Sequence, residues 1–520
     1  MSSLTEITLL SDRYPFDEHE LEILLRCHES LLATDRSGSF LNLLAHCSPY
    51  AFFFLPGDEF KTRIGMIEST ILPDGFGARL KDAIFSDCFP EAAHSLENNR
   101  YLEKFLEGVA DCGRRGEREA LNVLFDCCAK VEGDGVEKGS DKVAAHDIVA
   151  LCYRLSVASD VLIRPSIDQK ALSNHLQDDA VIIKPLAMSL AAFANGMEYV
   201  TRAQFIEWAD ENFPMIAFTT LTFMQNLIFH GKPNPPGKVS YKHALLDQPT
   251  DVFTTKDSPL LFALASMTPK MGGVWHRLYS TEADGRCFNR MEWSVLGYEG
   301  PTTLLIKAND GVILGAFASA PFKEVPHFFG DGETFLFSLD PVANVFHSVG
   351  GETNFIYCNA SWAKGHDGLP HGLGFGGTLN QPRLFISEAF DTCHAGFLDN
   401  TFQKGNLLPG DDSLERFDIK SMEIWGVGGE ATIAHALEKR DEHRQETDSV
   451  IYKARKVTDK SGFLPDLKSG LIDTNLYKHR EQARGRAEFV ADSKHGGYTL
   501  ERKDNESVPF PNEDLFNKAQ

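Results

Sequence analysis

The opening part of the chain follows a helical pattern of hydrophobic positions. Between residues 16 and 45, apolar side chains recur every three or four positions, so they share one helix face, with His28 at the edge of that face. Asp17 and Glu20 stand three residues apart at its start, which is the spacing of a reciprocal helix cap. Further stripes of this kind predict that residues 1–229 form one helical domain.

Two later segments have the spacing of helix–loop–helix units. One runs over residues 117–155 around the polar, glycine-rich stretch 132–141, and the other over residues 185–213 around a turn at 196–200. With the loop at 35–40, this organisation resembles the EF-hands of calcium-binding proteins of the calcineurin B type. The sequence therefore predicts an EF-hand-like helical domain.

The loops of these units depart from the ligand pattern that calcium requires. An EF-hand loop supplies oxygen ligands at its first, third and fifth positions and a bidentate glutamate at its twelfth. With Val200 at the eighth position, Phe193 stands at the first and Gln204 at the twelfth. The 35–40 loop lacks the glutamate, and the 132–141 stretch departs from the required length. We expect degenerate loops that keep the packing without a metal, with a calcium-gated adaptor as the alternative.

A proline-rich break ends the helical pattern. The sequence Gly-Lys-Pro-Asn-Pro-Pro-Gly at 231–237 suits neither a helix nor a central strand, so we assign residues 230–256 to a linker. From 257 to 430 the hydrophobic period falls towards two, which predicts strands. The remaining residues, 431–520, form a charged tail that we expect to be partly helical or disordered, with a helix over Ala431–Val450.

The strand pattern in residues 257–430 is bounded by turn-forming residues. Asn309-Asp310-Gly311 is a hairpin signal, and short helices are predicted through Met267 and over Asn289–Leu296. The predicted strands are Val274–Tyr279, Thr302–Lys307, Val312–Ala318, Thr334–Ser338, Asn344–His347, Phe355–Asn359, Arg383–Ile386 and Lys420–Trp425. The whole chain is thus predicted as α+β: a helical domain followed by an antiparallel β-sandwich with short flanking helices.

Composition narrows the kinds of partner. The net charge of −23 opposes binding to the phosphates of nucleic acid, because that binding depends on Lys and Arg. Ten cysteines without paired CxxC spacing fit neither a disulfide scaffold nor a zinc ribbon. The apolar runs are too short to cross a bilayer, and position 2 is Ser rather than the Gly that N-myristoylation needs. We expect a cytoplasmic protein without a transmembrane segment.

Several strings in the second half resemble the TLDc domain of the oxidation resistance proteins. They are Trp275-His-Arg-Leu-Tyr-Ser280, Asp284-Gly-Arg-Cys-Phe288, Pro301-Thr-Thr-Leu-Leu-Ile-Lys307, Gly330-Asp-Gly-Glu333, Gly374-Phe-Gly-Gly377, the run from Phe385 to Phe402 and the run from Phe417 to Gly429. An EF-hand-like region ahead of the domain and a charged tail behind it look like the lysosome-associated member of the family, which is linked to growth signalling.

The resemblance implies a non-catalytic binding module. TLDc proteins are expected to protect against oxidative stress and to bind subunits of the vacuolar proton pump, the V-ATPase. A cytoplasmic protein with peripheral association at the lysosomal or vacuolar membrane follows from the same resemblance, and no cofactor is implied.

Candidate contact residues lie in the run from Phe385 to Phe402, which we call the signature run, and at the end of the last predicted strand. They are Glu388, Asp391, Asp399, Asn400, Trp425, Gly426, Gly429 and Glu430. Among these, we expect Trp425 to pack in the core of the sandwich and the glycines to permit close backbone approach. The acidic residues are equally compatible with a solvated rim.

An enzymatic alternative rests on Cys393. Its neighbour His394 cannot readily serve as its base, because adjacent side chains of a strand point to opposite faces. A thiol-dependent enzyme acting on peroxides or small electrophiles would need another base, such as His366 or His371. The glycine-rich stretch 365–377 lacks the form of a phosphate-binding loop, so we expect it to join strands.

Overall fold

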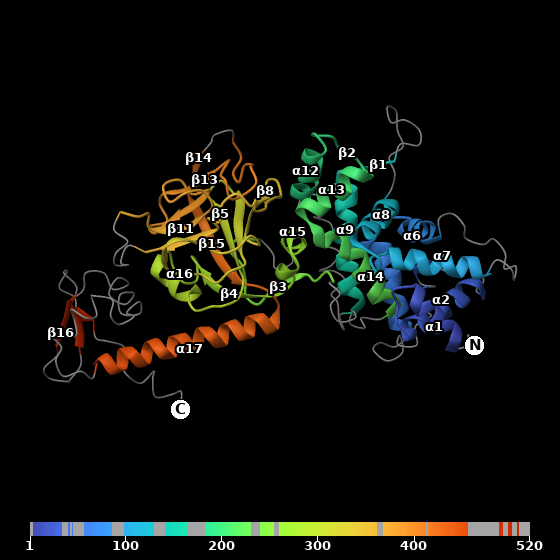
Figure 1. Ribbon diagram of the computed structural model, residues 1–520, viewed down its shortest axis with the longest axis horizontal. Coiled ribbons are helices and arrows are strands. Elements are labelled where there is room, and N and C mark those ends of the chain that lie inside the picture. The colour runs from blue at the N-terminus through green and yellow to red at the C-terminus, as the bar shows by residue number, and fades with distance from the viewer. Residues whose placement is uncertain are drawn as a thin grey trace.

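The computed structural model has a helical N-terminal part and a β-rich C-terminal part, which confirms the α+β class (Figure 1). The structure describes residues 4–33, 40–41, 44, 57–85, 98–128, 141–163, 183–229, 240–253, 259–360, 368–410, 414–455, 488–491, 498–501 and 507–508. The loop at 35–39, most of the 132–141 stretch and His366 lie outside these residues.

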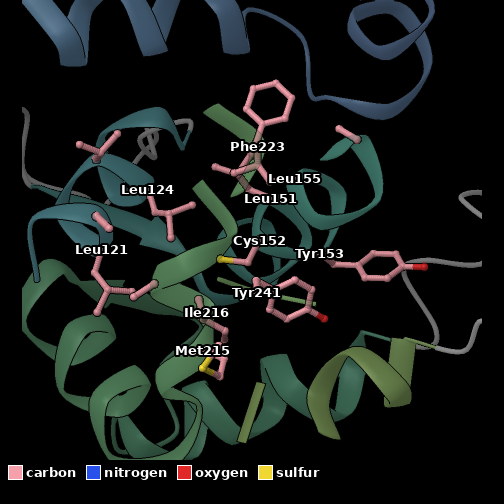
Figure 2. Packing of buried hydrophobic residues seen from close by; sticks show 14 of the residues in the cluster. Leu121, Leu124, Leu151, Cys152, Tyr153, Leu155, Met215, Ile216, Phe223 and Tyr241 are labelled. Atoms are coloured by element: carbon pink, nitrogen blue, oxygen red, sulfur yellow. The ribbon is translucent and has the colours of Figure 1, made fainter. Parts of the chain in front are cut away.

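Helices of the N-terminal part surround a common hydrophobic core (Figure 2). The helices are α1 (Leu4–Arg13), α2 (Glu18–Ala33), α5 (Gly57–Met66), η1 (Ile67–Ile71), α6 (Phe76–Phe85), α7 (Asn98–Asp111), α8 (Glu117–Cys127), α9 (Ala145–Ile163), α12 (Lys184–Phe193), α13 (Arg202–Asn212), η2 (Pro214–Ile216) and α14 (Ala217–Phe229). Leu124 from α8, Leu151 from α9 and Phe223 from α14 all enter this core, so the three helices are held together by apolar burial.

The start of α2 has the reciprocal cap that the sequence predicts. The backbone N–H of Asp17 donates to Glu20 Oε2 at 3.1 Å, and the N–H of Glu20 donates to Asp17 Oδ1 at 2.7 Å. His28 is buried on this helix, and burial lowers the pKa of its imidazole. Its role as a core histidine is thus confirmed.

Two helix–strand–helix units lie side by side in the N-terminal part. Strand β1 (Lys142–Ala144) joins α8 to α9, strand β2 (Tyr199–Thr201) joins α12 to α13, and the two strands pair antiparallel with Val143 opposite Val200. Asn195 and Gly196 have positive φ angles of 59° and 77°, which make the turn before β2. The helices and the turn that the sequence predicts are therefore present.

Arg202 ties these two units together. Its Nη2 lies 2.6 Å from Asp126 Oδ1, at the end of α8, and 3.0 Å from Asp141 Oδ2, just before β1. The guanidinium also stacks over the Phe125 ring at 4.7 Å, and ion pairing raises the pKa of Arg202. The guanidinium of Arg202, at the start of α13, thus bridges two carboxylates of the first helix–strand–helix unit.

The β-rich part contains two sheets. One has the order β14-β13-β12-β11-β10-β7 and the other the order β3-β4-β15-β5-β6-β8-β9, antiparallel throughout except for the parallel β3–β4 pair. The strands are β3 (Ala244–Leu246), β4 (Gly273–Ser280), β5 (Thr302–Ala308), β6 (Ile313–Ala318), β7 (Val325–Phe329), β8 (Phe335–Asp340), β9 (Asn344–Phe346), β10 (Ile356–Asn359), β11 (Gly372–Phe375), β12 (Leu384–Ser387), β13 (Cys393–Gly396), β14 (Leu414–Phe417) and β15 (Ile419–Gly426). Helices α15 (Pro259–Met267), η3 (Pro269–Met271) and α16 (Phe288–Val295) accompany them.

All eight strands that the sequence predicts are present. The described residues of the two sheets contain five more strands that the hydrophobic pattern does not predict. The predicted hairpin joins β5 to β6, with Gly311 at φ 96°. The strands outside the predicted ranges are β3, β7, β11, β13 and β14, although the sequence prediction already takes Cys393 and His394 of β13 as strand residues. They are short, and they carry a proline in β7, glycines in β11 and alternating charges in β14, so their pairing is decided by neighbouring strands rather than by their own composition.

The seven-stranded sheet is buried on both faces. Leu304, Leu314 and Met422 face a cluster shared with the six-stranded sheet. Alternate residues such as Phe317 and Trp425 belong instead to the cluster that includes the N-terminal helices. The sequence prediction that Trp425 packs between the two sheets is wrong, because its position in β15 points it to the opposite face.

Helix α15 and the segment before it connect the two parts. All nine residues of α15 are buried, and Phe262 contacts the rings of Tyr153 in α9 and Tyr241 at centroid distances of 5.5 and 5.6 Å. Residues 240–253, which the sequence assigns to the linker, include β3 and are fixed to β15 by Glu423, which accepts from Thr250 Oγ1 at 2.8 Å. This segment is part of the folded structure.

Helix α17 (Glu430–Arg455) begins shortly after β15 ends at Gly426 and includes the helix predicted over Ala431–Val450. Arg440 and Arg444 donate to the carbonyl oxygens of Ser294 and Trp293, both at 3.3 Å. These carbonyls lie at the C-terminal end of α16, where helix carbonyls lack intrahelical partners and favour cations. Strands β16 (Glu488–Ala491), β17 (Tyr498–Glu501) and β18 (Ser507–Val508) form a further small sheet.

We predict that Phe262→Ala destabilises both parts of the chain. The substitution opens a cavity in the core that α15 shares with both parts, and should lower the free energy of unfolding by about 3–5 kcal/mol. Urea denaturation followed by tryptophan fluorescence measures this. Leu9→Ala is the matched control because Leu9 is 70% exposed, and an equal effect of the two substitutions would contradict the shared core.

Candidate functional site

The signature run forms a tight turn between β12 and β13. Ser387 Oγ accepts from the N–H groups of Asp391 and Thr392, both at 3.1 Å, and donates to Asp391 Oδ1 at 2.9 Å. These hydrogen bonds lower the pKa of Asp391. Phe390 has a φ of 59°, which is costly for a bulky residue, and its buried ring packs near Phe288. Tertiary packing thus fixes this turn.

Asp399 is the centre of a second turn, after β13. Its Oδ2 accepts from the N–H of Gly377 at 2.9 Å and from the N–H of Thr401 at 3.0 Å, and its side chain is 4% exposed. The neighbouring Asn400 is exposed and donates to Glu352 Oε1 at 3.3 Å. Asp399 therefore ties its own turn to the loop at Gly377, whereas Asn400 faces solvent.

A buried arginine supports the same turn. The guanidinium of Arg383 is fully buried, its Nη2 donates to the carbonyl oxygen of Gly405, and its Nη1 lies 4.0 Å from Asp399 Oδ1. Burial lowers the pKa of Arg383 to about 10. Arg383 was not among the predicted site residues, since an arginine in a short strand gives no sign in the sequence of being buried.

The glycine-rich stretch before β12 makes room for these side chains. A Cβ on Gly376 would lie 2.7 Å from Asp399 Oδ2, and one on Gly372 would lie 2.9 Å from the Phe385 ring. Gly376 and Gly377 also have positive φ angles of 67° and 69°. The prediction that the whole stretch joins strands is wrong for Gly372–Phe375, which form β11 between β10 and β12, while Gly376 and Gly377 make the turn after it. Side chains of the protein occupy the space beside these glycines.

The other candidate residues lie at the end of β15. Trp425 is fully buried, with its Nε1 donating to Glu423 Oε2 at 2.9 Å, and offers no atom to a partner in this conformation. Gly426 accommodates the Tyr298 ring, because a Cβ there would lie 2.4 Å from its hydroxyl oxygen. Gly429 has a φ of 89° and turns the chain into α17, where Glu430 is exposed in the first turn.

The structure divides the eight candidate residues between two sheets. Glu388 is partly exposed beside β12 and Asp391 is exposed, while Asp399 and Asn400 follow β13; all four belong to the six-stranded sheet and its loops. The remaining four lie at the end of β15 in the other sheet. They do not make a single pocket, and the exposed side chains among them are those of Asp391, Asn400 and Glu430.

The surroundings of Cys393 disfavour a reactive thiolate. The side chain is 1% exposed, and burial raises its pKa to about 11. Its antiparallel partner is Phe417, while His394 packs against the Phe385 ring at 5.4 Å. Burial also lowers the pKa of His394. Among the described residues, no histidine is hydrogen-bonded to this sulfur.

No group of three or more metal-ligating side chains occurs within the described ranges. None of the described helices combines the length and apolar character that a bilayer crossing needs.

Residues 252–428, which include the signature turn and its glycine-rich support, match the TLDc domain family. The chain therefore carries a TLDc domain, as the sequence predicts. It is similar to MTOR-associated protein MEAK7 of Danio rerio, with 33% identity over 34% of this chain and 38% of that protein.

Two further relatives extend the comparison. MTOR-associated protein MEAK7 of Gallus gallus is 23% identical over 69% of this chain and 76% of that protein. Oxidation resistance protein 1 of Xenopus tropicalis is 36% identical over 30% of this chain and 16% of that protein. The first matches span about a third of the length of the MEAK7 relatives.

We predict that Cys393 reacts slowly in the folded chain. With a pKa of about 11, its thiolate fraction at neutral pH should be roughly 300-fold below that of a free cysteine. Timed iodoacetamide labelling with mass spectrometry of the Cys393 peptide measures the rate, and the partly exposed Cys287 is the internal comparison. Labelling of Cys393 as fast as that of Cys287 would restore the thiol-enzyme hypothesis.

Asp399→Ala should loosen the second turn. Removal of the carboxylate leaves buried N–H groups without an acceptor, and we expect a loss of about 3 kcal/mol in unfolding free energy. Urea denaturation and amide hydrogen exchange over residues 396–405 provide the measurement. Asn400→Ala is the adjacent control, and its free energy of unfolding should change by no more than about 0.5 kcal/mol. Equal losses of unfolding free energy in the two variants would show that the Asp399 carboxylate does not stabilise this turn.

Proposed function

We propose that the protein is a non-enzymatic TLDc adaptor that binds and regulates the V-ATPase and contributes to oxidative-stress resistance. The TLDc match and the relatives named for MTOR association and for oxidation resistance support a role in protein binding. The single observation that favours an adaptor over an enzyme is the burial of Cys393, because a reactive cysteine needs an accessible thiolate.

We also infer finer features of the fold. The antiparallel β1–β2 pair between two helix–strand–helix units supports an EF-hand-like pair with degenerate loops. The cluster shared by the two sheets supports a sandwich arrangement of the TLDc domain. We propose a cytoplasmic protein that associates peripherally with the lysosomal or vacuolar membrane through its protein partner.

Binding should be tested with the full-length chain, because a fragment beginning at residue 257 lacks β3 and the Thr250 contact to Glu423. Immobilised chain is incubated with the purified cytosolic sector of the V-ATPase, and retained subunits are quantified against empty beads. We expect stoichiometric retention and a change in the ATPase rate of that sector. Retention no higher than on a denatured-chain control would refute V-ATPase binding.

A further inference from the structure

Arg202 stands at a position where a helix does not favour a cation. It is the first residue of α13, directly after the N-cap Thr201, and the N-terminal end of a helix carries partial positive charge. Its polar partners belong to the other helix–strand–helix unit, on α8 and just before β1 (Figure 1). Contacts between the two units, rather than its own helix, therefore place this side chain.

The guanidinium is surrounded by oxygen atoms. Asp126 accepts with both carboxylate oxygens, at 2.6 Å from Nη2 and 3.1 Å from Nη1. Asp141 Oδ2 lies 3.0 Å from Nη2 and 3.1 Å from Nε. Asn122 accepts from Nη1 with its backbone oxygen at 3.2 Å and its side-chain oxygen at 3.4 Å. Carboxylates, side-chain amide oxygens and backbone carbonyls are the ligands that calcium takes in proteins.

These oxygens belong to the two ends of one connection. Asn122 and Asp126 lie on α8, and Asp141 directly precedes β1, so Arg202 joins the end of the first helix to the start of the strand. In a calcium-binding helix–loop–helix unit, the ion ties together the positions of the loop between the helices. Here the buried ring of Phe125 also lies against the cation, with its centroid 4.7 Å from the guanidinium carbon.

The second unit uses its own would-be ligand in another way. Gln204 stands where a calcium loop has its bidentate glutamate, and its Oε1 accepts from the N–H of Thr201 at 2.9 Å and from the Thr201 hydroxyl at 3.0 Å. Thr201 Oγ1 in turn accepts from the N–H of Gln204 at 3.4 Å. The oxygen at the twelfth position therefore caps α13.

We propose that the Arg202 guanidinium takes the place of a calcium ion in the first unit, so that the two units keep their arrangement without calcium. The inference uses the EF-hand-like pairing proposed above and goes beyond the adaptor function, because it needs no partner.

The proposal has two requirements. The wild-type chain must take up no calcium, including through Glu132, Asp134 and Glu137, which belong to residues 129–140 outside the described ranges. Once the guanidinium is removed, the unit must accept a divalent cation, because the carboxylates of Asp126 and Asp141 then lie close together without a countercharge.

Calorimetric titration of the full-length chain with calcium chloride tests both requirements. Calcium is raised to about 5 mM, above the roughly 1 mM of weak protein sites, at constant ionic strength. We expect no uptake by the wild type and about one ion per chain for Arg202→Ser, with affinity about ten-fold lower or less when Asp126→Asn is added. Uptake by the wild type, or none by Arg202→Ser, would overturn the proposal.

Hydrogen exchange measures whether calcium replaces the arginine in holding the units. In calcium-free buffer, Arg202→Ser should speed exchange of the β1 and β2 amides by about ten-fold or more, and calcium should restore the wild-type rate. Arg202→Lys keeps the positive charge and should take up no calcium. The matched control is Arg13→Ser, which removes the exposed pair with Glu103 and should change neither measurement. Faster exchange that calcium leaves unchanged, or calcium uptake by Arg202→Lys equal to that of Arg202→Ser, would contradict the proposal.

Unfolding of the variant would also give a decisive result. If Arg202→Ser lacks helical circular dichroism without calcium, the proposal requires that calcium restore it, and that Asp126→Asn prevent this recovery. No recovery of Arg202→Ser would refute the role assigned to Arg202. Because these measurements contain no V-ATPase, their failure leaves V-ATPase binding untouched, and a failure to retain the V-ATPase leaves the role of Arg202 untouched.

Discussion

The seven-stranded sheet is buried on both faces, and the placement of the elements around it follows from this burial. One face contributes to a cluster with the six-stranded sheet, and the other to a cluster with α15 and the N-terminal helices. Since a strand places successive side chains on opposite faces, β5, β6, β8 and β15 are buried at nearly every position. The polar Glu423 of β15 is buried among hydrogen-bond donors from Thr250, Asp251 and Trp425. This is why α15 is buried on all its residues and why the segment 240–253 is fixed to the sheet.

The six-stranded sheet, unlike the seven-stranded one, has an exposed edge. Its inner residues join the cluster between the sheets, while β14 forms an edge with charged residues and the exposed Leu414. Its connecting turns are held by buried polar groups, chiefly Asp399 and Arg383. Rigidity at this edge thus comes from hydrogen bonds, whereas rigidity in the other sheet comes from apolar burial.

In the signature run, residues that look reactive in the sequence stabilise the fold instead. In the linear chain Cys393 looks like a nucleophile and Asp399 like a contact residue, yet the first is a buried thiol and the second accepts hydrogen bonds from the backbone. The glycines at 372 and 376 leave room for the Phe385 ring and the Asp399 carboxylate. These residues therefore hold the turns and strands of the six-stranded sheet in place.

Local patterns in the sequence determined the α+β class, the cap at Asp17 and Glu20, the hairpin at Gly311, the apolar strands and the TLDc strings, because each depends on residues close together in the chain. The short strands β11, β13 and β14 were not determined in this way, since their glycines, small residues and charges become strand only beside paired neighbours. The face of the sheet that Trp425 joins and the burial of Arg383 against Asp399 come only from the tertiary fold. Each of these depends on contacts between residues far apart in sequence, which hydrophobic periodicity cannot encode.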